Sequence, residues 1–203
     1  MSAINQGLQF LQQLQLTDGS FYSLSSPKID NFEHSLTYST TFTTALILIS
    51  LQHFKNQAIA QSIISKGCRF LSTQASDQLS FNYWSQNSTE YITKPYPDDL
   101  DDTFLALSAL TLHQPKMFTG KAMAQIVQLL TATEEQIGGP YRTWLTNGPQ
   151  WINIDPTVNS AIGYFLYLHD INFPNLDNYF QQQLKIEPFK SSYYPTNKPF
   201  LCL

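Results

Sequence analysis

The chain has 203 residues, long enough for one domain that buries roughly 70% of the surface its unfolded chain exposes. Its formal net charge is −4 at pH 7 and its eleven Lys and Arg residues form no basic stripe, which argues against a nucleic-acid partner and against acidic membrane surfaces. Two cysteines do not indicate a disulfide scaffold, and no apolar run near the start resembles a signal peptide or a membrane span, so we expect a cytoplasmic protein.

One sequence pattern occurs three times along the chain. In each copy an apolar residue lies four positions before a Gln or Glu, and a turn then leads to an aromatic residue. Residues four apart share a helix face, so each copy predicts a helix end followed by an aromatic-capped turn. The copies are Gly7, Leu11, Gln15, Gly19 and Phe21; Gly67, Phe70, Gln74, Leu79 and Phe81; and Leu130, Glu134, Gly139 and Tyr141.

Between and after these copies lie three segments that are apolar nearly all round, which indicates helices buried on more than one side. They are Thr41 to Leu51, Thr103 to Leu112 and Thr157 to Leu168. Each begins at a polar cluster and ends near a histidine, where an imidazolium would stabilise the helix dipole: His53, His113 and His169. The pattern predicts αα hairpins with amphipathic outer helices and buried inner helices, whose N-termini open toward the same end.

Four carboxylates crowd into five positions before the second inner helix: Asp98, Asp99, Asp101 and Asp102. Such crowding is tolerated where solvent, a cation, a helix N-terminus or a shared proton relieves the repulsion. A helix N-terminus favours the charged form by only about 0.3–1 kcal/mol, whereas burial beside other carboxylates can raise a pKa by about 3–5 units. The run is therefore a helix start, an acid site if it is buried, or both.

The connections 85–97 and 141–155 run from an outer helix to the start of an inner one, so we expect both to overhang the polar end. Aromatic residues make up 14% of the chain, which favours an aromatic-lined cavity there. The tail from about residue 187 is rich in Pro, Tyr and Lys and has no clear helix. The candidates to line the cavity are Tyr83, Trp84, Phe104, Tyr141 and Trp144, together with Asp155 and Asn159.

These patterns resemble the terpenoid cyclase and protein prenyltransferase superfamily, which is built as an α/α toroid. The three copies are similar to its glutamine-tryptophan repeat, with Phe or Tyr at each Trp position, over most of residues 6 to 168. Asp99-Leu100-Asp101-Asp102-Thr103 is similar to the DxDDT signature of class II cyclases such as squalene-hopene cyclase. The resemblance implies an all-α fold, in which residues 1–203 form a single domain of αα-hairpin repeats. Three hairpins would make a partial toroid, which a second copy or another chain would complete.

The resemblance also implies a reaction and roles for residues. Asp101 would donate a proton to an alkene or epoxide of a linear isoprenoid, Asp99 and Asp102 would hold Asp101 in position, and Thr103 would form a hydrogen bond nearby. Aromatic rings would then stabilise the carbocation and exclude water. The implied activity is that of a class II terpene cyclase-like isomerase that needs no cofactor.

Three alternatives stay open. The run also fits the DDxxD motif of class I terpene synthases, with Asp98, Asp99 and Asp102 holding Mg²⁺, although the second metal motif of those enzymes is absent from the sequence. The zinc site of protein prenyltransferases needs Asp, Cys and His, but Cys68 falls in an outer helix. The third alternative is a non-catalytic module that binds an isoprenoid, a peptide or a partner chain on an open concave face.

Overall fold

The computed structural model describes residues 2–26, 34–186 and 191–194. Over these residues the protein is mostly helical, with one small two-stranded sheet. The outer helices are α1 (Ala3–Leu14), α3 (Ala58–Gln74) and α6 (Gly120–Thr133), and the inner helices are α2 (Thr41–Leu51), α5 (Leu100–His113) and α7 (Pro156–Leu168). The short helix α4 (Thr89–Thr93) precedes α5, and α8 (Pro174–Gln183) follows α7.

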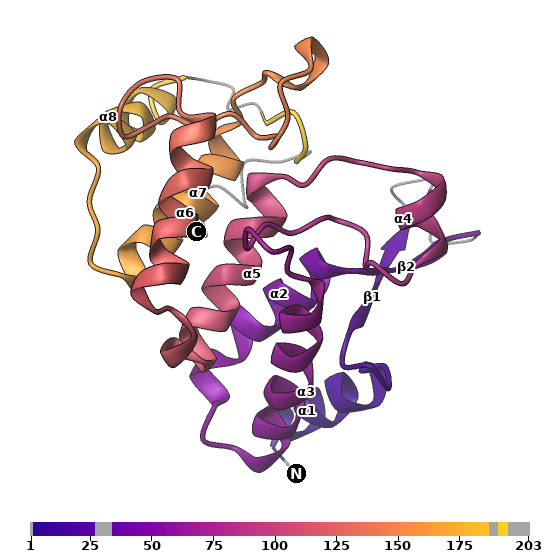
Figure 1. Cartoon of the computed structure of the whole chain (residues 1–203). Helices are drawn as coiled ribbons and strands as arrows, with labels where there is room; N and C mark the ends of the chain where they lie inside the picture. Colours follow the sequence, from indigo (N-terminus) through magenta and orange to yellow (C-terminus); the bar gives the residue numbers. More distant parts are fainter. Residues whose placement is uncertain (1, 27–33, 187–190, 195–203) are drawn as a thin grey trace.

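Helix α5 occupies the middle of the molecule and packs against α2 on one side and α7 on the other (Figure 1). Its residues from Asp102 to Thr111 are all buried, which explains why this segment is apolar nearly all round. The predicted inner helices are confirmed, and the bounds of α2 are those predicted. Helix α5 starts earlier than predicted, because the Asp99 side chain caps it by accepting the Asp102 backbone N–H at 2.8 Å.

The aromatic-capped turn occurs three times, as the sequence predicts. In each copy the residue two positions before the ring has a positive φ: 98° at Gly19, 64° at Leu79 and 93° at Gly139. The N–H of each of these residues donates to the carbonyl three positions earlier. At Gly19 a side chain has no room, because a Cβ atom would lie 2.2 Å from the Lys66 carbonyl oxygen.

Each turn is fastened to the following inner helix by one buried hydrogen bond. The N–H of the ring residue donates to a side-chain oxygen that lies four residues after the helix cap. The three pairs are Phe21 with Thr44 Oγ1 at 3.0 Å, Phe81 with Thr103 Oγ1 at 2.9 Å, and Tyr141 with Asn159 Oδ1 at 2.8 Å. Thr103 and Asn159, predicted for the functional site, therefore hold the repeats together.

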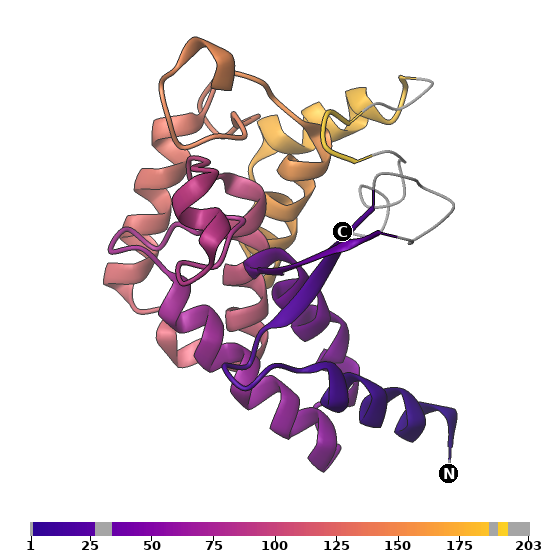
Figure 2. The same ribbon diagram turned by 90° about the vertical axis from the view of Figure 1, so that its right-hand side faces the viewer.

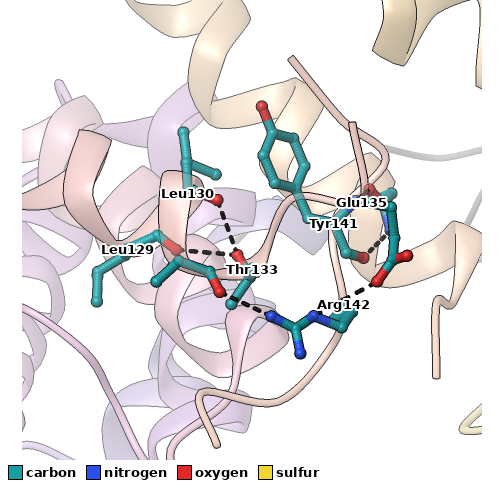
Figure 3. Close-up of polar contacts among 8 residues, drawn as sticks. Leu129, Leu130, Thr133, Glu135, Tyr141 and Arg142 are labelled. Carbon is teal, nitrogen blue, oxygen red and sulfur yellow. Dashed lines mark hydrogen bonds and ion pairs between the residues drawn. The ribbon is translucent and has the colours of Figure 1, made fainter. Parts of the chain in front are cut away.

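The third turn is also held to the end of α6 by Arg142 (Figure 3). The Arg142 guanidinium donates to the Ala132 carbonyl at 2.8 Å and pairs with Glu135 at 3.5 Å, and the Arg142 backbone N–H donates to the Thr133 carbonyl. These contacts fix the direction in which the chain leaves α6. They position the connection that carries Trp144.

The all-α expectation is wrong for one segment. Strand β1 (Phe21–Ser25) pairs antiparallel with β2 (Leu36–Thr40), and this ribbon lies on the side of the helices that faces the viewer in Figure 2. The register places the ring residue Phe21 opposite the cap residue Thr40, and Phe81 pairs with the cap residue Asp99 in an isolated bridge. The ribbon is thus an extended form of a pairing that the second repeat makes with one residue on each side.

Two of the three histidines near the inner helix ends, His113 and His169, do not act as the predicted imidazolium caps. Burial lowers the pKa of His113 and of His169, which favours the neutral rings. His113 Nε2 lies 2.8 Å from the Leu48 carbonyl, and His169 Nε2 lies 3.0 Å from Thr111 Oγ1.

Among the described helices, none has the length and apolar character needed to cross a membrane.

Candidate functional site

A partly open cavity of about 450 Å³ lies where α2 and α5 begin. Its wall combines three carboxyl groups with six aromatic rings, so acidic and apolar surfaces face the same space. The lining residues are Ser23, Phe42, Tyr83, Tyr96, Asp99, Asp101, Asp102, Thr143, Trp144, Tyr193 and Tyr194. This acidic cavity is the candidate functional site.

The first turn of α5 is held in place from two sides. The Leu100 N–H donates to the Thr143 carbonyl at 2.7 Å, and Asp99 forms isolated bridges with both Phe81 and Trp144. The connections from α3 and from α6 therefore meet at the cap of α5. The connection 141–155 thus lies over the start of α5, as predicted, and Tyr96 from the connection 85–97 lines the cavity there.

Asp99 and Asp102 form a buried pair of carboxyl groups that are hydrogen-bonded to each other. Burial raises the pKa of Asp99 to about 6, and burial together with the charge of Asp99 raises the pKa of Asp102 well above its usual value. Burial raises the pKa of both groups, so the pair keeps a proton to higher pH than an isolated carboxyl group does. Thr41 Oγ1 lies 3.4 Å from Asp102 Oδ1, and it makes its shorter hydrogen bond, of 2.5 Å, by donating to the Asn82 carbonyl oxygen.

Asp101 is the third carboxyl group of the cavity. Burial, followed by the charge of Asp99, raises its pKa to about 7, so a large fraction of it keeps its proton at neutral pH. The hydroxyl of Tyr194 donates to Asp101 Oδ2. Asp101 Oδ1 is buried and has no hydrogen-bond partner among the described residues.

Aromatic rings from distant parts of the chain complete the cavity. The Phe42 ring lies 6.3 Å from Tyr83 and 6.2 Å from Tyr194, and Tyr96 lies 6.3 Å from Trp144, measured between ring centroids. Of these, the sequence predicted Tyr83 and Trp144. Aromatic rings that line a cavity can stabilise a cation there through their negative π faces.

Four lining rings were missed from the sequence: Phe42, Tyr96, Tyr193 and Tyr194. For Phe42 a signal exists, because it lies two residues after the cap Thr40 just as Asp101 lies two residues after the cap Asp99. Tyr96 belongs to a connection that was predicted to overhang the site, but nothing in its sequence distinguishes it from Tyr91. The two tail tyrosines come from a segment with no periodic pattern.

Three aromatic residues predicted to line the cavity lie elsewhere in the structure. Trp84 packs behind the cavity wall, with its ring 4.7 Å from Tyr83, because its backbone bridges to Thr40. Phe104 is fully buried against Phe165 of α7. Tyr141 is buried at the third turn.

Asp155 also lies outside the cavity lining. One of its carboxylate oxygens caps α7, and the other accepts hydrogen bonds from the C-terminal segment at Ser191 and Ser192. It therefore links α7 to the segment that carries the two tail tyrosines, rather than contacting a ligand directly.

The ligand sets of both metal alternatives are not gathered in one place. Asp98 accepts hydrogen bonds from Ser80 and Asn82 and lines a neighbouring cavity rather than the one that contains Asp99 and Asp102. Cys68 is buried in α3, where burial raises its pKa to about 11. Over residues 2–26, 34–186 and 191–194, no group of three His, Cys, Asp or Glu side chains is placed to hold a metal ion.

Comparison with models of protein families gives no match, and comparison with curated proteins gives none either. The chemistry that the acidic cavity can perform is therefore the basis on which a function is assigned.

Proposed function

We propose that this protein is an acid catalyst that cyclises a linear isoprenoid, in the manner of class II terpene cyclases. The observation that supports it is Asp101, a carboxylic acid with a pKa of about 7 at a cavity walled by aromatic rings. An acid that is partly protonated near neutral pH can act as a proton donor without a cofactor. The rings supply what a cationic intermediate needs after the proton has left.

The reaction begins when the acidic proton of Asp101 is transferred to an alkene carbon or an epoxide oxygen of the substrate, and in the epoxide the C–O bond to the tertiary carbon then breaks. Asp101 becomes a carboxylate, and the positive charge appears on a tertiary carbon of the chain. A neighbouring double bond attacks that carbon and forms the ring bond. The last cation then loses a proton to a base, or is captured by water. The π faces of Phe42, Tyr83 and Trp144 stabilise the charge as it moves along the chain.

The cavity favours a neutral substrate over a diphosphate. Among the described residues that line it there are three carboxyl groups and no Lys or Arg. A diphosphate would meet the charge of Asp99 and no cationic side chain to offset its own charge. A cavity of about 450 Å³ falls within the range of about 300–1,000 Å³ that is typical of small-molecule sites.

We infer that the hairpins form an arc of an α/α toroid, in which the acidic cavity lies at the end where the inner helices begin. The three equivalent turns, each fastened to the next inner helix by the same hydrogen bond, support this inference. The packing of α5 between α2 and α7 supports it as well. Closure of the ring by a second copy would show as self-association in solution.

Product analysis by gas chromatography and mass spectrometry tests the proposed function. The parent protein is incubated with neutral linear terpenes, their terminal epoxides and their alcohols, and we expect a cyclic isomer from at least one of them. Asp101→Asn keeps the size of the side chain but has no acidic proton, so turnover should fall by a factor of about 10³ or more.

Asp98→Asn is the matched control, since it makes the same change in the same acidic run at a residue outside the cavity. It should retain turnover. Binding of an isoprenoid without any product would instead favour the non-catalytic module. Loss of turnover in EDTA with recovery on adding Mg²⁺ would favour the class I alternative.

A further inference from the structure

The described C-terminal segment, residues 191–194, is anchored beside the cavity by Asp155. The Ser191 hydroxyl and the Ser192 N–H both donate to Asp155 Oδ2, at 2.8 Å and 2.6 Å. Ser191 Oγ in turn accepts the N–H groups of Tyr193 and Tyr194, at 3.2 Å and 3.1 Å. The segment is thereby folded into a tight turn at the start of α7.

A second anchor comes from Tyr193. Its hydroxyl accepts hydrogen bonds from Trp144 Nε1 at 2.6 Å and from Asn153 Nδ2 at 2.7 Å. One anchor is at the start of α7, and the other is on the connection that follows α6. With both anchors in place, the centroid of the Tyr194 ring lies 6.2 Å from that of Phe42, and the Tyr194 hydroxyl donates to Asp101 Oδ2.

We propose that Tyr194 is a positioning residue for the acid: its hydroxyl holds Oδ2 of Asp101 and stabilises the carboxylate that proton transfer leaves behind. This inference deepens the proposed function and rests on it for its catalytic consequence. The hydrogen bond itself is a property of the free protein, so it can be measured without any substrate.

The charges around Asp101 show why such a partner matters. The charges of Asp99 and Asp155 both raise the pKa of Asp101, and Asp102 is a third carboxyl group close by. No Lys or Arg lies among the described lining residues to oppose them. The hydrogen bond from Tyr194 lowers the pKa of Asp101. Burial and the charge of Asp101 raise the pKa of Tyr194, so its hydroxyl stays a donor at every working pH.

Tyr194→Phe removes the hydroxyl and keeps the ring. Without the hydrogen bond the Asp101 carboxylate is less stable, so Asp101 holds its proton to higher pH and is a weaker acid. Two opposite effects on activity follow. The maximal rate should fall, because a weaker acid transfers its proton less readily, whereas the decline of activity on the alkaline side should begin at higher pH. A purely structural role for Tyr194 predicts no alkaline shift.

The first measurement is an infrared titration of the protonated carboxyl band in the substrate-free protein, with Asp101→Asn used to identify the Asp101 signal. We expect the band to titrate near pH 7 in the parent. In Tyr194→Phe it should titrate about one pH unit higher, the size expected for losing a hydrogen bond to a charged group. Tyr96→Phe is the matched control, because it removes a tyrosine hydroxyl from the same cavity without touching Asp101, and its titration should match the parent.

A variant that loosens the anchor provides an independent check. Ser191→Ala removes a hydroxyl that binds Asp155 and caps the turn, so Tyr194 should engage Asp101 less often and the band should shift in the same direction by a smaller amount. An unchanged or lowered titration in Tyr194→Phe would overturn the proposal.

The second measurement is the pH profile of turnover, once a substrate is found. We expect kcat for Tyr194→Phe to fall by about tenfold or more, with little change in KM and with the alkaline limb moved upward. A fall in kcat without that movement would overturn the positioning role. An infrared shift in a protein that cyclises no isoprenoid would disprove the proposed function and leave the link between Tyr194 and Asp101 intact.

Discussion

Asp101→Asn should stabilise the protein at pH 8 and leave its stability unchanged at pH 4. An acid whose pKa is raised by folding favours the folded state only while it is protonated. Its contribution is complete below the pKa of the unfolded chain and is lost as the pH rises through the pKa of the folded state. Asparagine carries no charge at any pH, so it escapes this loss.

The size of the expected gain in folding stability follows from the pKa shift of Asp101. The pKa of Asp101 moves from 3.8 to about 7 on folding, and each unit corresponds to about 1.4 kcal/mol, which sets a limit of about 4 kcal/mol above pH 7. Asp101 is only half-buried as a residue, and an amide group must now fit against Tyr194, so we expect a gain of about 2–4 kcal/mol. The gain should develop between pH 4 and pH 8.

Thermal and urea unfolding at pH 4, 6 and 8 would measure it. For a chain of this length 1 kcal/mol corresponds to about 2–4 °C in Tm, so the gain at pH 8 is large enough to resolve. Asp77→Asn is the control, because Asp77 is exposed and its replacement removes one negative charge without removing a buried one. A variant less stable than the parent at every pH, or a gain that does not change with pH, would refute the reasoning.

Thr103→Val should cost about 1–3 kcal/mol in urea unfolding, because the buried Phe81 N–H loses its acceptor, whereas Thr103→Ser should keep most of the stability. Gly19→Ala should lower Tm, because a Cβ atom cannot fit 2.2 Å from the Lys66 carbonyl oxygen, and an unchanged Tm would contradict the tight turn. Phe104→Ala should cost about 3–5 kcal/mol as a cavity in the core, with the infrared titration of Asp101 unaffected. Turnover measured in EDTA should equal turnover with added Mg²⁺.

The inner helices could be predicted because burial on several sides leaves a long apolar run with a polar cap, and no other element produces that pattern at this length. The turns could be predicted because they repeat. The ribbon could have been recognised from the aromatic residues of its two strands and the threonines of β2, which are typical of strands. It was missed because the helical repeat on both sides of it set the expectation.

The cavity could be predicted only in part. Asp99, Asp101 and Asp102 are found from their crowding, but their burial depends on residues far away in the chain, such as Thr143, which the sequence does not connect to them. Tyr194 lies 93 residues from Asp101, and no periodicity relates the two. Such a contact depends on where the C-terminal segment packs against the rest of the protein, and local sequence patterns do not encode that position.

Comparison of the three inner helices indicates that the acidic residues of α5 are more than a helix cap. Capping needs one acceptor in each repeat, and Thr40, Asp99 and Asp155 supply it for α2, α5 and α7. The two positions that Asp101 and Asp102 occupy in α5 are filled by uncharged residues in the other inner helices.

Burying those two additional carboxyl groups stabilises nothing at neutral pH. By the linkage above, Asp101 alone costs up to about 4 kcal/mol against a total stability that is typically about 5–15 kcal/mol. A cap could be made at this position by Asp99 without that cost. Destabilising groups persist in a fold where they perform a function, and a carboxyl group kept protonated beside aromatic rings is suited to donating its proton.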